Sequence, residues 1–292
     1  MFNHFTSLLL RKHNHMILDD CWRKPDMVSH RDLLAKKWLT GDGLEIGALH
    51  QPVKIPRGAT VRYVDYKSKT ENQERYPEID SHLIVNTHLI DDGFILNNIP
   101  DRSVDFIIAN HALEHSPDPY GTLLKWKLKL RYKGRLYFAV PIAEKCYDNG
   151  RPLTTLDHFL NDYHLFSSLE VSQIFAVTES HLREFLRISD ANIRRLNQMT
   201  TLRTEQEIEE YCAELMWGLK ESVSETKTRY DDLISAHVNY INKLYDIHYH
   251  TFSPTSMHKF VNYFCEREFS RLVEFKKSGN GECIAILENL SE

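Results

Sequence analysis

The stretch Gly43-Leu44-Glu45-Ile46-Gly47-Ala48 decides the fold of this chain, together with the stretch Val61-Arg62-Tyr63-Val64-Asp65 that follows it. A short apolar segment ends in an acidic residue and a glycine. A second, β-branched and aromatic segment ends in an aspartate about 20 residues later. Strands of this kind lie side by side in a parallel sheet, and their carboxyl ends meet at one edge, where an acidic side chain binds the hydroxyls of a ribose. The two stretches therefore predict a binding site for an adenosine-like cofactor.

Further segments have the character of buried parallel strands, because several of them are nearly continuous apolar runs. The strands expected from the sequence are residues 43–46, 61–65, 82–86, 104–109 and 135–140. Between the last two, residues 119–132 are predicted to form a helix with leucines at helical spacing. Gly134 is expected to end this helix in a left-handed conformation.

The C-terminal residues predict a helix followed by a hairpin. Ser253-Pro254 is typical of a helix start, and the helix is expected to run to Glu266. Residues 269–275 and 282–287 have the character of two strands on either side of Ser278-Gly279-Asn280-Gly281. That turn pattern favours antiparallel pairing of the two strands.

After Pro141 the sequence shows little strand character and much helix character. Helices are expected over residues 154–166, 178–189, 204–220 and 227–245. Thr204 and Glu207 have the spacing of a capping box at the start of the third helix. We therefore predict an α/β fold in which a doubly wound, mostly parallel sheet has a C-terminal antiparallel hairpin and a large helical insertion. The predicted domains are an N-terminal helical segment (1–40), the core (41–142 and 251–292) and the insertion (143–250).

The composition is that of an ordinary globular protein. Of the 292 residues, 42% are hydrophobic and 26% are charged, and the net charge is −5, so no basic excess favours nucleic acid as a partner. The five cysteines are scattered without a CxxC pair, which indicates reduced thiols and no disulfide framework. No apolar run approaches the ~20 residues that span a bilayer. We expect a cytoplasmic protein without a membrane span, and its oligomeric state stays open.

Three motifs resemble those of the class I S-adenosylmethionine-dependent methyltransferases. They are the stretch from Gly43 to Pro52, the turn Asp91-Asp92-Gly93, and Ala109-Asn110-His111-Ala112-Leu113-Glu114-His115 after the fourth strand. The last is similar to a His-x-Leu-Glu-His pattern of many small-molecule methyltransferases. Within that superfamily, the run from Arg151 to His158 resembles a bacterial subgroup associated with glycan assembly. The resemblance implies a Rossmann-like fold and S-adenosyl-L-methionine as the cofactor.

The resemblance also implies a role for each residue at the expected sheet edge. Gly47 lets the backbone approach the methionyl part of the cofactor, and Glu45 orients that part and its ammonium group. Asp65 accepts both ribose hydroxyls. Asp92 accepts from the adenine amino group, and the Gly93 amide lies near the ring. Four further cofactor-binding residues are implied by their positions at the same edge: Ala48, Tyr66, Asn110 and His111.

The glycine loop departs from the pattern of the methyltransferases that it resembles. That pattern is Gly-x-Gly-x-Gly, and here Leu49 and Gln51 stand at the second and third glycine positions. Pro52 and Pro56 then leave little room for a helix before the second strand. The amino end of that helix normally receives the carboxylate of the cofactor. We expect His50, Gln51 or a basic residue of the N-terminal segment to hold the carboxylate instead.

Methyl transfer from a sulfonium needs donor and acceptor in line, and a hydroxyl acceptor must also lose its proton. A histidine is the expected base, and the chain has 16 histidines. His111, directly after the fourth strand, is the best-placed candidate. His158 is the second candidate, and it shares a face of the first inserted helix with Asp162. Other closely spaced histidines, such as His248 and His250, match no recognised zinc or iron spacing, so no metal site is predicted.

The insertion is expected to fold over the carboxyl edge of the sheet as a lid and to form the acceptor site. Tyr147 and Arg151 are the candidate substrate-binding residues, because an aromatic face and a guanidinium suit a sugar or an anionic small molecule. Trp217, Leu215 and Leu219 are interpreted as part of the insertion's own core.

These observations lead to one hypothesis and two alternatives. The hypothesis is an enzyme, an S-adenosylmethionine-dependent methyltransferase that acts on a small-molecule or glycan-related acceptor by O-methylation. The first alternative is a catalytically silent methyltransferase-like subunit that holds a partner with its helical insertion, which the altered glycine loop favours. The second is a nicotinamide-dependent oxidoreductase with a similar sheet. The missing Gly-x-Gly-x-x-Gly pattern and the terminal hairpin disfavour this second alternative.

Overall fold

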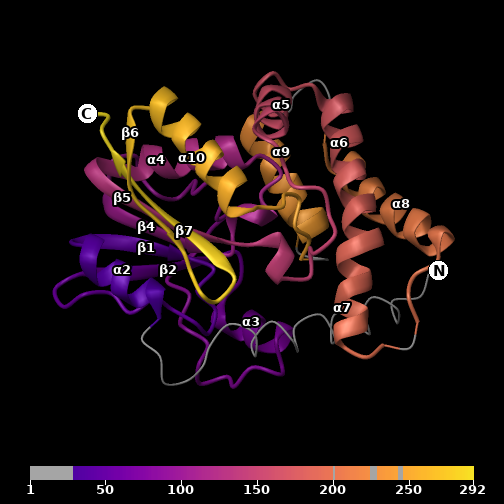
Figure 1. Cartoon of the computed structure of the whole chain (residues 1–292), viewed down its shortest axis with the longest axis horizontal. Helices are drawn as coiled ribbons and strands as arrows, with labels where there is room; N and C mark the ends of the chain where they lie inside the picture. The colour runs from indigo at the N-terminus through magenta and orange to yellow at the C-terminus, as the bar shows by residue number, and fades with distance from the viewer. Residues whose placement is uncertain (1–28, 200, 224–228, 243–245) are drawn as a thin grey trace.

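A computed structural model of the chain describes residues 29–199, 201–223, 229–242 and 246–292 (Figure 1). These residues form one mixed sheet of seven strands in the order β3-β2-β1-β4-β5-β7-β6. The strands are β1 (Asp42–Ile46), β2 (Thr60–Asp65), β3 (Leu89–Ile90), β4 (Val104–Asn110), β5 (Leu130–Pro141), β6 (Ser270–Lys277) and β7 (Glu282–Asn289). The first five are mutually parallel, whereas β7 is antiparallel to both β5 and β6. The predicted fold class is confirmed.

Helices cover both faces of the sheet. On one face, α2 (His30–Trp38) buries Leu34 and Ala35 against side chains of β4, β5 and β7. On the other face, α4 (Pro119–Lys129) and α10 (Pro254–Arg267) pack against the same strands, with Trp126 and Phe264 fully buried. Helix α2 belongs to the predicted N-terminal helical segment, of which residues 1–28 lie outside the described part of the chain.

Two expected elements differ from the observed ones. Residues 82–86 do not form a strand. They belong to a turn that buries the apolar Ile84, and the short strand β3 begins later, at Leu89. Gly134 does not cap α4, which ends at Lys129, but lies inside β5. A Cβ at Gly134 would lie 2.9 Å from the Arg131 carbonyl oxygen, so the glycine is needed for close backbone packing instead.

The chain between β5 and α10 is helical, as predicted (Figure 1). It contains α5 (Leu156–Ser167), α6 (Val171–Glu184), the π-helical turn η3 (Phe185–Ser189), α7 (Asp190–Leu196), α8 (Glu205–Ser222), α9 (Tyr230–His237) and the π-helical turn η4 (Val238–Asn242). The capping box of Thr204 and Glu207 is present at the start of α8. The fourth expected helix extends into residues outside the described ranges at both of its ends. The boundaries predicted for the three domains stay a prediction.

These helices have a hydrophobic core of their own, to which Leu182, Phe185, Leu215 and Leu219 belong. The prediction that Trp217 shares this core is wrong, because its side chain is 68% exposed. Residues 215 and 219 are four positions apart and lie on one face of α8, while residue 217 points to the other face. Within the described ranges, every helix is too short or too polar to cross a membrane.

Candidate functional site

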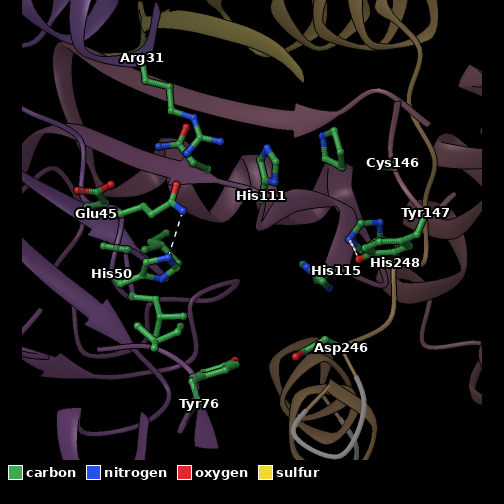
Figure 2. Close-up of a pocket in the computed structure, with 18 residues that line it drawn as sticks. Arg31, Glu45, His50, Tyr76, His111, His115, Cys146, Tyr147, Asp246 and His248 are labelled. Atoms are coloured by element: carbon green, nitrogen blue, oxygen red, sulfur yellow. Dashed lines mark hydrogen bonds between the residues drawn. The ribbon is translucent and has the colours of Figure 1, made fainter. Parts of the chain in front are cut away.

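Two adjoining cavities open at the carboxyl edge of the parallel strands. Their volumes are ≈ 240 Å³ and ≈ 180 Å³, and both are lined by Gly47, His111 and Asp246. The larger cavity continues toward β5 and the inserted helices, and Figure 2 shows the side chains that surround it. The smaller cavity extends toward the ends of β2 and β3. The two together form one bent site that follows the edge of the sheet.

The turn after β1 shapes the wall shared by the two cavities. Gly47 has a φ of +64°, in the left-handed region that favours glycine, and a Cβ placed there would have no atom within 4 Å. The space beside it is therefore open to a ligand. Glu45 is 1% exposed, and its carboxylate accepts the Val53 N–H at 3.0 Å, which folds the following loop back onto the sheet. No helix forms between β1 and β2, as Pro52 and Pro56 predict.

Two carboxylates from neighbouring strands line the smaller cavity. Asp65 ends β2 and accepts the Lys67 N–H at 3.0 Å. Asp92 follows β3 and accepts the Phe94 N–H at 3.0 Å and the Ser235 hydroxyl of α9 at 3.1 Å. Burial raises the pKa of both carboxyl groups above their usual range. The inserted helices thus close this cavity on the side of Asp92.

The end of β4 contributes Asn110 and His111. The side-chain amide of Asn110 lines the larger cavity, and its Nδ2 and Oδ1 are buried without a hydrogen-bond partner among the described residues. Such a group is expected to pair with a ligand, because an unpaired buried amide costs about 1–3 kcal/mol. His111 has a φ of +52°, a strained conformation for a residue that is not glycine.

His111 belongs to a hydrogen-bond network with the first turn of α2 and the first residue of β7. Its Nε2 lies 2.9 Å from Oε2 of Glu282, which also accepts from the Arg31 guanidinium at 3.1 Å. Burial alone raises the pKa of Glu282, but the hydrogen bond from His111 and the charge of Arg31 outweigh it and lower the pKa to about 2. Arg31 also lines the larger cavity, where its Nη1 has no hydrogen-bond partner among the described residues.

A second histidine network forms the opposite wall of the larger cavity. The Tyr147 hydroxyl lies 2.5 Å from Nε2 of His248, and Nδ1 of His248 lies 2.5 Å from Oδ2 of Asp148. Arg151 donates to Asp148 at 3.0 Å and to the His248 carbonyl at 2.8 Å. Burial opposes ionisation of Asp148, but His248 and Arg151 together hold its pKa well below the usual range. Figure 2 shows His111 between this wall and the side of Arg31 and Glu45.

An ion pair crosses the outer wall that the two cavities share. Arg75, the last residue of α3 (Lys69–Arg75), donates to Asp246 at 2.9 Å. The neighbouring Tyr76 and Asp246 line both cavities, and Asp246 belongs to the segment that returns from the inserted helices to α10. This pair joins the core to that returning segment across the site.

The structure brings together most of the residues predicted for the site. Eight of them line the larger cavity: Glu45, Gly47, Ala48, His50, Gln51, Asn110, His111 and Tyr147. Gly47 and His111 also line the smaller cavity, together with Asp65, Tyr66, Asp92 and Gly93. Arg151 and His158 line neither cavity: Arg151 is buried behind Asp148, and His158 lies on α5 beside Asp162.

The sequence analysis assigned no site role to six polar residues of the site: Arg31, Tyr76, Asp148, Asp246, His248 and Glu282. Glu282 could have been found from the hairpin, because antiparallel pairing aligns the start of β7 with Pro141 at the end of β5. His248 stands in the His-x-His pattern with His250, but its partner Asp148 is 100 positions away. Arg31, His50 and Gln51, the three residues that correspond to the expectation for the cofactor carboxylate, all line the larger cavity.

No protein-family model matches this chain, and no curated protein matches its sequence. Among solved structures it is similar to a methyltransferase dependent on S-adenosylmethionine from Aquifex aeolicus, with 8% identity, 99% of each chain covered and a TM-score of 0.41. A protein proposed to have the same activity, from Methanococcus maripaludis, shares 12% identity over 100% of this chain and 95% of that one, with a TM-score of 0.42.

A third similar structure is a protein from Rhodobacter sphaeroides proposed to be a Zn-dependent alcohol dehydrogenase. The identity is 13%, the alignment covers 98% of this chain and 97% of that one, and the TM-score is 0.42. None of the three similarities is close enough to indicate a shared family. The function is therefore argued from the site itself.

Proposed function

We propose that this protein is an S-adenosyl-L-methionine-dependent methyltransferase that acts on a small-molecule or glycan-related acceptor by O-methylation. The observation that carries the proposal is the pair Asp65 and Asp92, which end neighbouring parallel strands and line one cavity together with Gly47. Their carboxylates would bind the ribose hydroxyls and the adenine amino group. When bound, the cofactor supplies an electrophilic methyl group on a sulfonium.

The residues around the two cavities fit this cofactor. The open space beside Gly47 admits a ligand against the backbone, and the unpaired amide of Asn110 offers a donor and an acceptor there. The cofactor's carboxylate needs a cation in place of the missing helix end after β1. Arg31 meets this need, since its guanidinium lines the larger cavity with Nη1 unused by the described residues.

His111 is the proposed general base because it lines both cavities and so lies where the cofactor site meets the remaining space. Donation of its Nε2–H to Glu282 favours the tautomer whose Nδ1 is basic. Glu282 then stabilises the imidazolium that forms when the acceptor hydroxyl loses its proton. Arg31 keeps Glu282 ionised for this role.

The part of the larger cavity beyond His111 is the proposed acceptor site. Tyr147 and His248 present aromatic rings there, and both belong to residues 143–250. Aromatic rings beside polar side chains suit a small hydroxylated molecule or one end of a glycan. The relation to glycans is supported by the resemblance of the stretch from Arg151 to His158.

Calorimetric titration of the purified full chain tests the proposal. S-adenosylmethionine and S-adenosylhomocysteine are expected to bind with micromolar affinity, and NADH, the control for a nicotinamide site, is expected not to bind. An acceptor screen that starts with sugars then measures the conversion of S-adenosylmethionine into S-adenosylhomocysteine. Absence of binding by both sulfur nucleosides would contradict the proposal and favour a binding subunit, while binding of NADH alone would favour an oxidoreductase.

A further inference from the structure

Four side chains outside both cavities converge on one point between α5, α6 and the segment that leads into α10. Three are imidazoles, and all three present Nε2 to the same oxygen, Oδ2 of Asp162. The distances to this oxygen are 3.2 Å for His158, 3.6 Å for His181 and 3.7 Å for His250. The Nε2 atoms of His158 and His181 are 3.2 Å apart. We call these four residues the His3Asp cluster.

Three of the four side chains of the cluster are buried, and two of them lack well-aligned hydrogen bonds among the described residues. The side chains of Asp162 and His250 are 0% exposed. Both oxygens of Asp162 and both ring nitrogens of His250 lack a well-aligned hydrogen bond among the described residues, so the charge of Asp162 has only the three neighbouring imidazoles as partners. Burying an ionised carboxylate and imidazoles without well-aligned hydrogen bonds costs several kcal/mol, and buried charged groups are therefore paired or coordinate a metal. The arrangement therefore calls for a further positive group at its centre.

The spacing within the cluster is that of ligands around one tetrahedral metal ion. Bonds of about 2.0–2.1 Å to nitrogen and oxygen place the ligand atoms of a tetrahedron about 3.3–3.4 Å apart. The four measured separations, 3.2, 3.2, 3.6 and 3.7 Å, lie on either side of this value. All four ligand atoms lie within 4.8 Å of one another. From this geometry we propose that His158, Asp162, His181 and His250 bind one divalent transition-metal ion, of which Zn²⁺ fits best.

The donor set favours Zn²⁺ over the hard cations. Three imidazole nitrogens and one carboxylate oxygen suit zinc and its neighbours, whereas magnesium and calcium prefer sites made entirely of oxygen. Four protein ligands also leave no open position for a substrate, which is typical of a structural zinc site. The His158 side chain is 43% exposed and gives the ion a route from solvent.

The position of the cluster shows what such an ion would hold together. His158 and Asp162 are one turn apart on α5, and His181 lies on the neighbouring α6 (Figure 1). His250 lies in the returning segment, where Phe252 forms a bridge with Ile142 at the end of β5. A metal ion here would link α5 and α6, the first two inserted helices, to the returning segment that leads into α10. This role differs from the catalytic role predicted for His158.

Metal analysis of the purified full chain, stripped with a chelator and reloaded with Zn²⁺ or Co²⁺ salts, tests the proposal. The expected result is one equivalent of metal per chain, a visible Co²⁺ spectrum of four-coordinate type, and a thermal midpoint that rises on reloading. The decisive variant is His158→Gln, because this ligand is partly exposed and its loss leaves the fold intact. Its affinity for Zn²⁺ is expected to fall about tenfold or more.

His164→Gln is the matched control, since His164 is an exposed histidine on the same helix α5 and lies outside the cluster. Its affinity for Zn²⁺ is expected to equal that of the unaltered chain. Failure of the unaltered chain to bind either metal would overturn the proposal. So would an affinity of His158→Gln equal to that of the control, which would place the metal elsewhere. Because the cluster lines neither cavity, titration with S-adenosylmethionine tests the proposed function separately.

Discussion

Nε2 of His111 lies 2.9 Å from Oε2 of Glu282, although 171 positions separate the two residues in the chain. The contact exists because β5 lies between β4 and β7 in the sheet. Strand β4 is parallel to β5 and ends at the edge of the sheet where β7, which is antiparallel to β5, begins. The terminal hairpin therefore does more than extend the sheet: it supplies the acid that orients the proposed base.

Replacement of His111 tests its role as the base. Asn is the suitable substitute, because it tolerates the positive φ of this position better than Ala does. His111→Asn is expected to lower the rate of methyl transfer by about 10²–10⁴-fold while cofactor affinity changes little. Single-turnover rates and calorimetric affinities separate the two effects. The exposed His82 provides the control substitution His82→Asn, and equal rates in both variants would remove His111 from the catalytic residues.

The ionisation of Glu282 is expected to make the stability of the fold depend on pH. Its pKa falls from 4.5 to about 2 on folding, so it stabilises the folded state above about pH 5, by about 3 kcal/mol. This stabilisation is lost as the pH falls from 4.5 toward 2. Glu282→Gln removes this component of the pH dependence. Urea unfolding of the unaltered chain and of Glu282→Gln at several pH values between neutral and acidic checks this. The same dependence of the free energy of unfolding on pH in both proteins would contradict it.

Asp65 is expected to contribute a charged hydrogen bond to cofactor binding. Asp65→Ala should weaken the affinity for S-adenosylmethionine by about 1.5–3 kcal/mol, with the fold intact. Glu214→Ala, which removes an exposed carboxylate from α8, is the matched control and should leave the affinity unchanged. Calorimetry of the two variants decides the matter, since equal affinities would exclude Asp65 from the ribose site.

Two large residues of α8 are expected to differ sharply in their contribution to stability. Leu219 is 0% exposed in the core of the inserted helices, so Leu219→Ala should lower the free energy of unfolding by about 2–5 kcal/mol. Trp217 is 68% exposed, and Trp217→Ala should change the free energy of unfolding by about 0.5 kcal/mol or less. Urea denaturation measures both. A large loss in the tryptophan variant would show that its ring is covered in solution.

The sequence by itself determined the sheet and one side of the site. Strands β1 and β2 are recognisable from short runs of residues, and parallel strands place their carboxyl ends at one edge. Glu45, Gly47 and Asp65 could therefore be placed together without any knowledge of distant contacts. Asp92 follows the next strand, and it was found from a local turn pattern even though the strand itself was expected several residues too early.

Only the tertiary structure decided which distant side chains meet. Glu282 reaches His111 through the strand order, and Asp148 reaches His248 because the inserted helices return the chain to the end of β5. The His3Asp cluster joins His158 and Asp162, one turn apart on α5, to His181 and His250, which no short spacing relates to them, so the sequence predicted no metal site there. Local patterns report secondary structure, but such contacts depend on how whole elements pack, and that packing is set by the complete core.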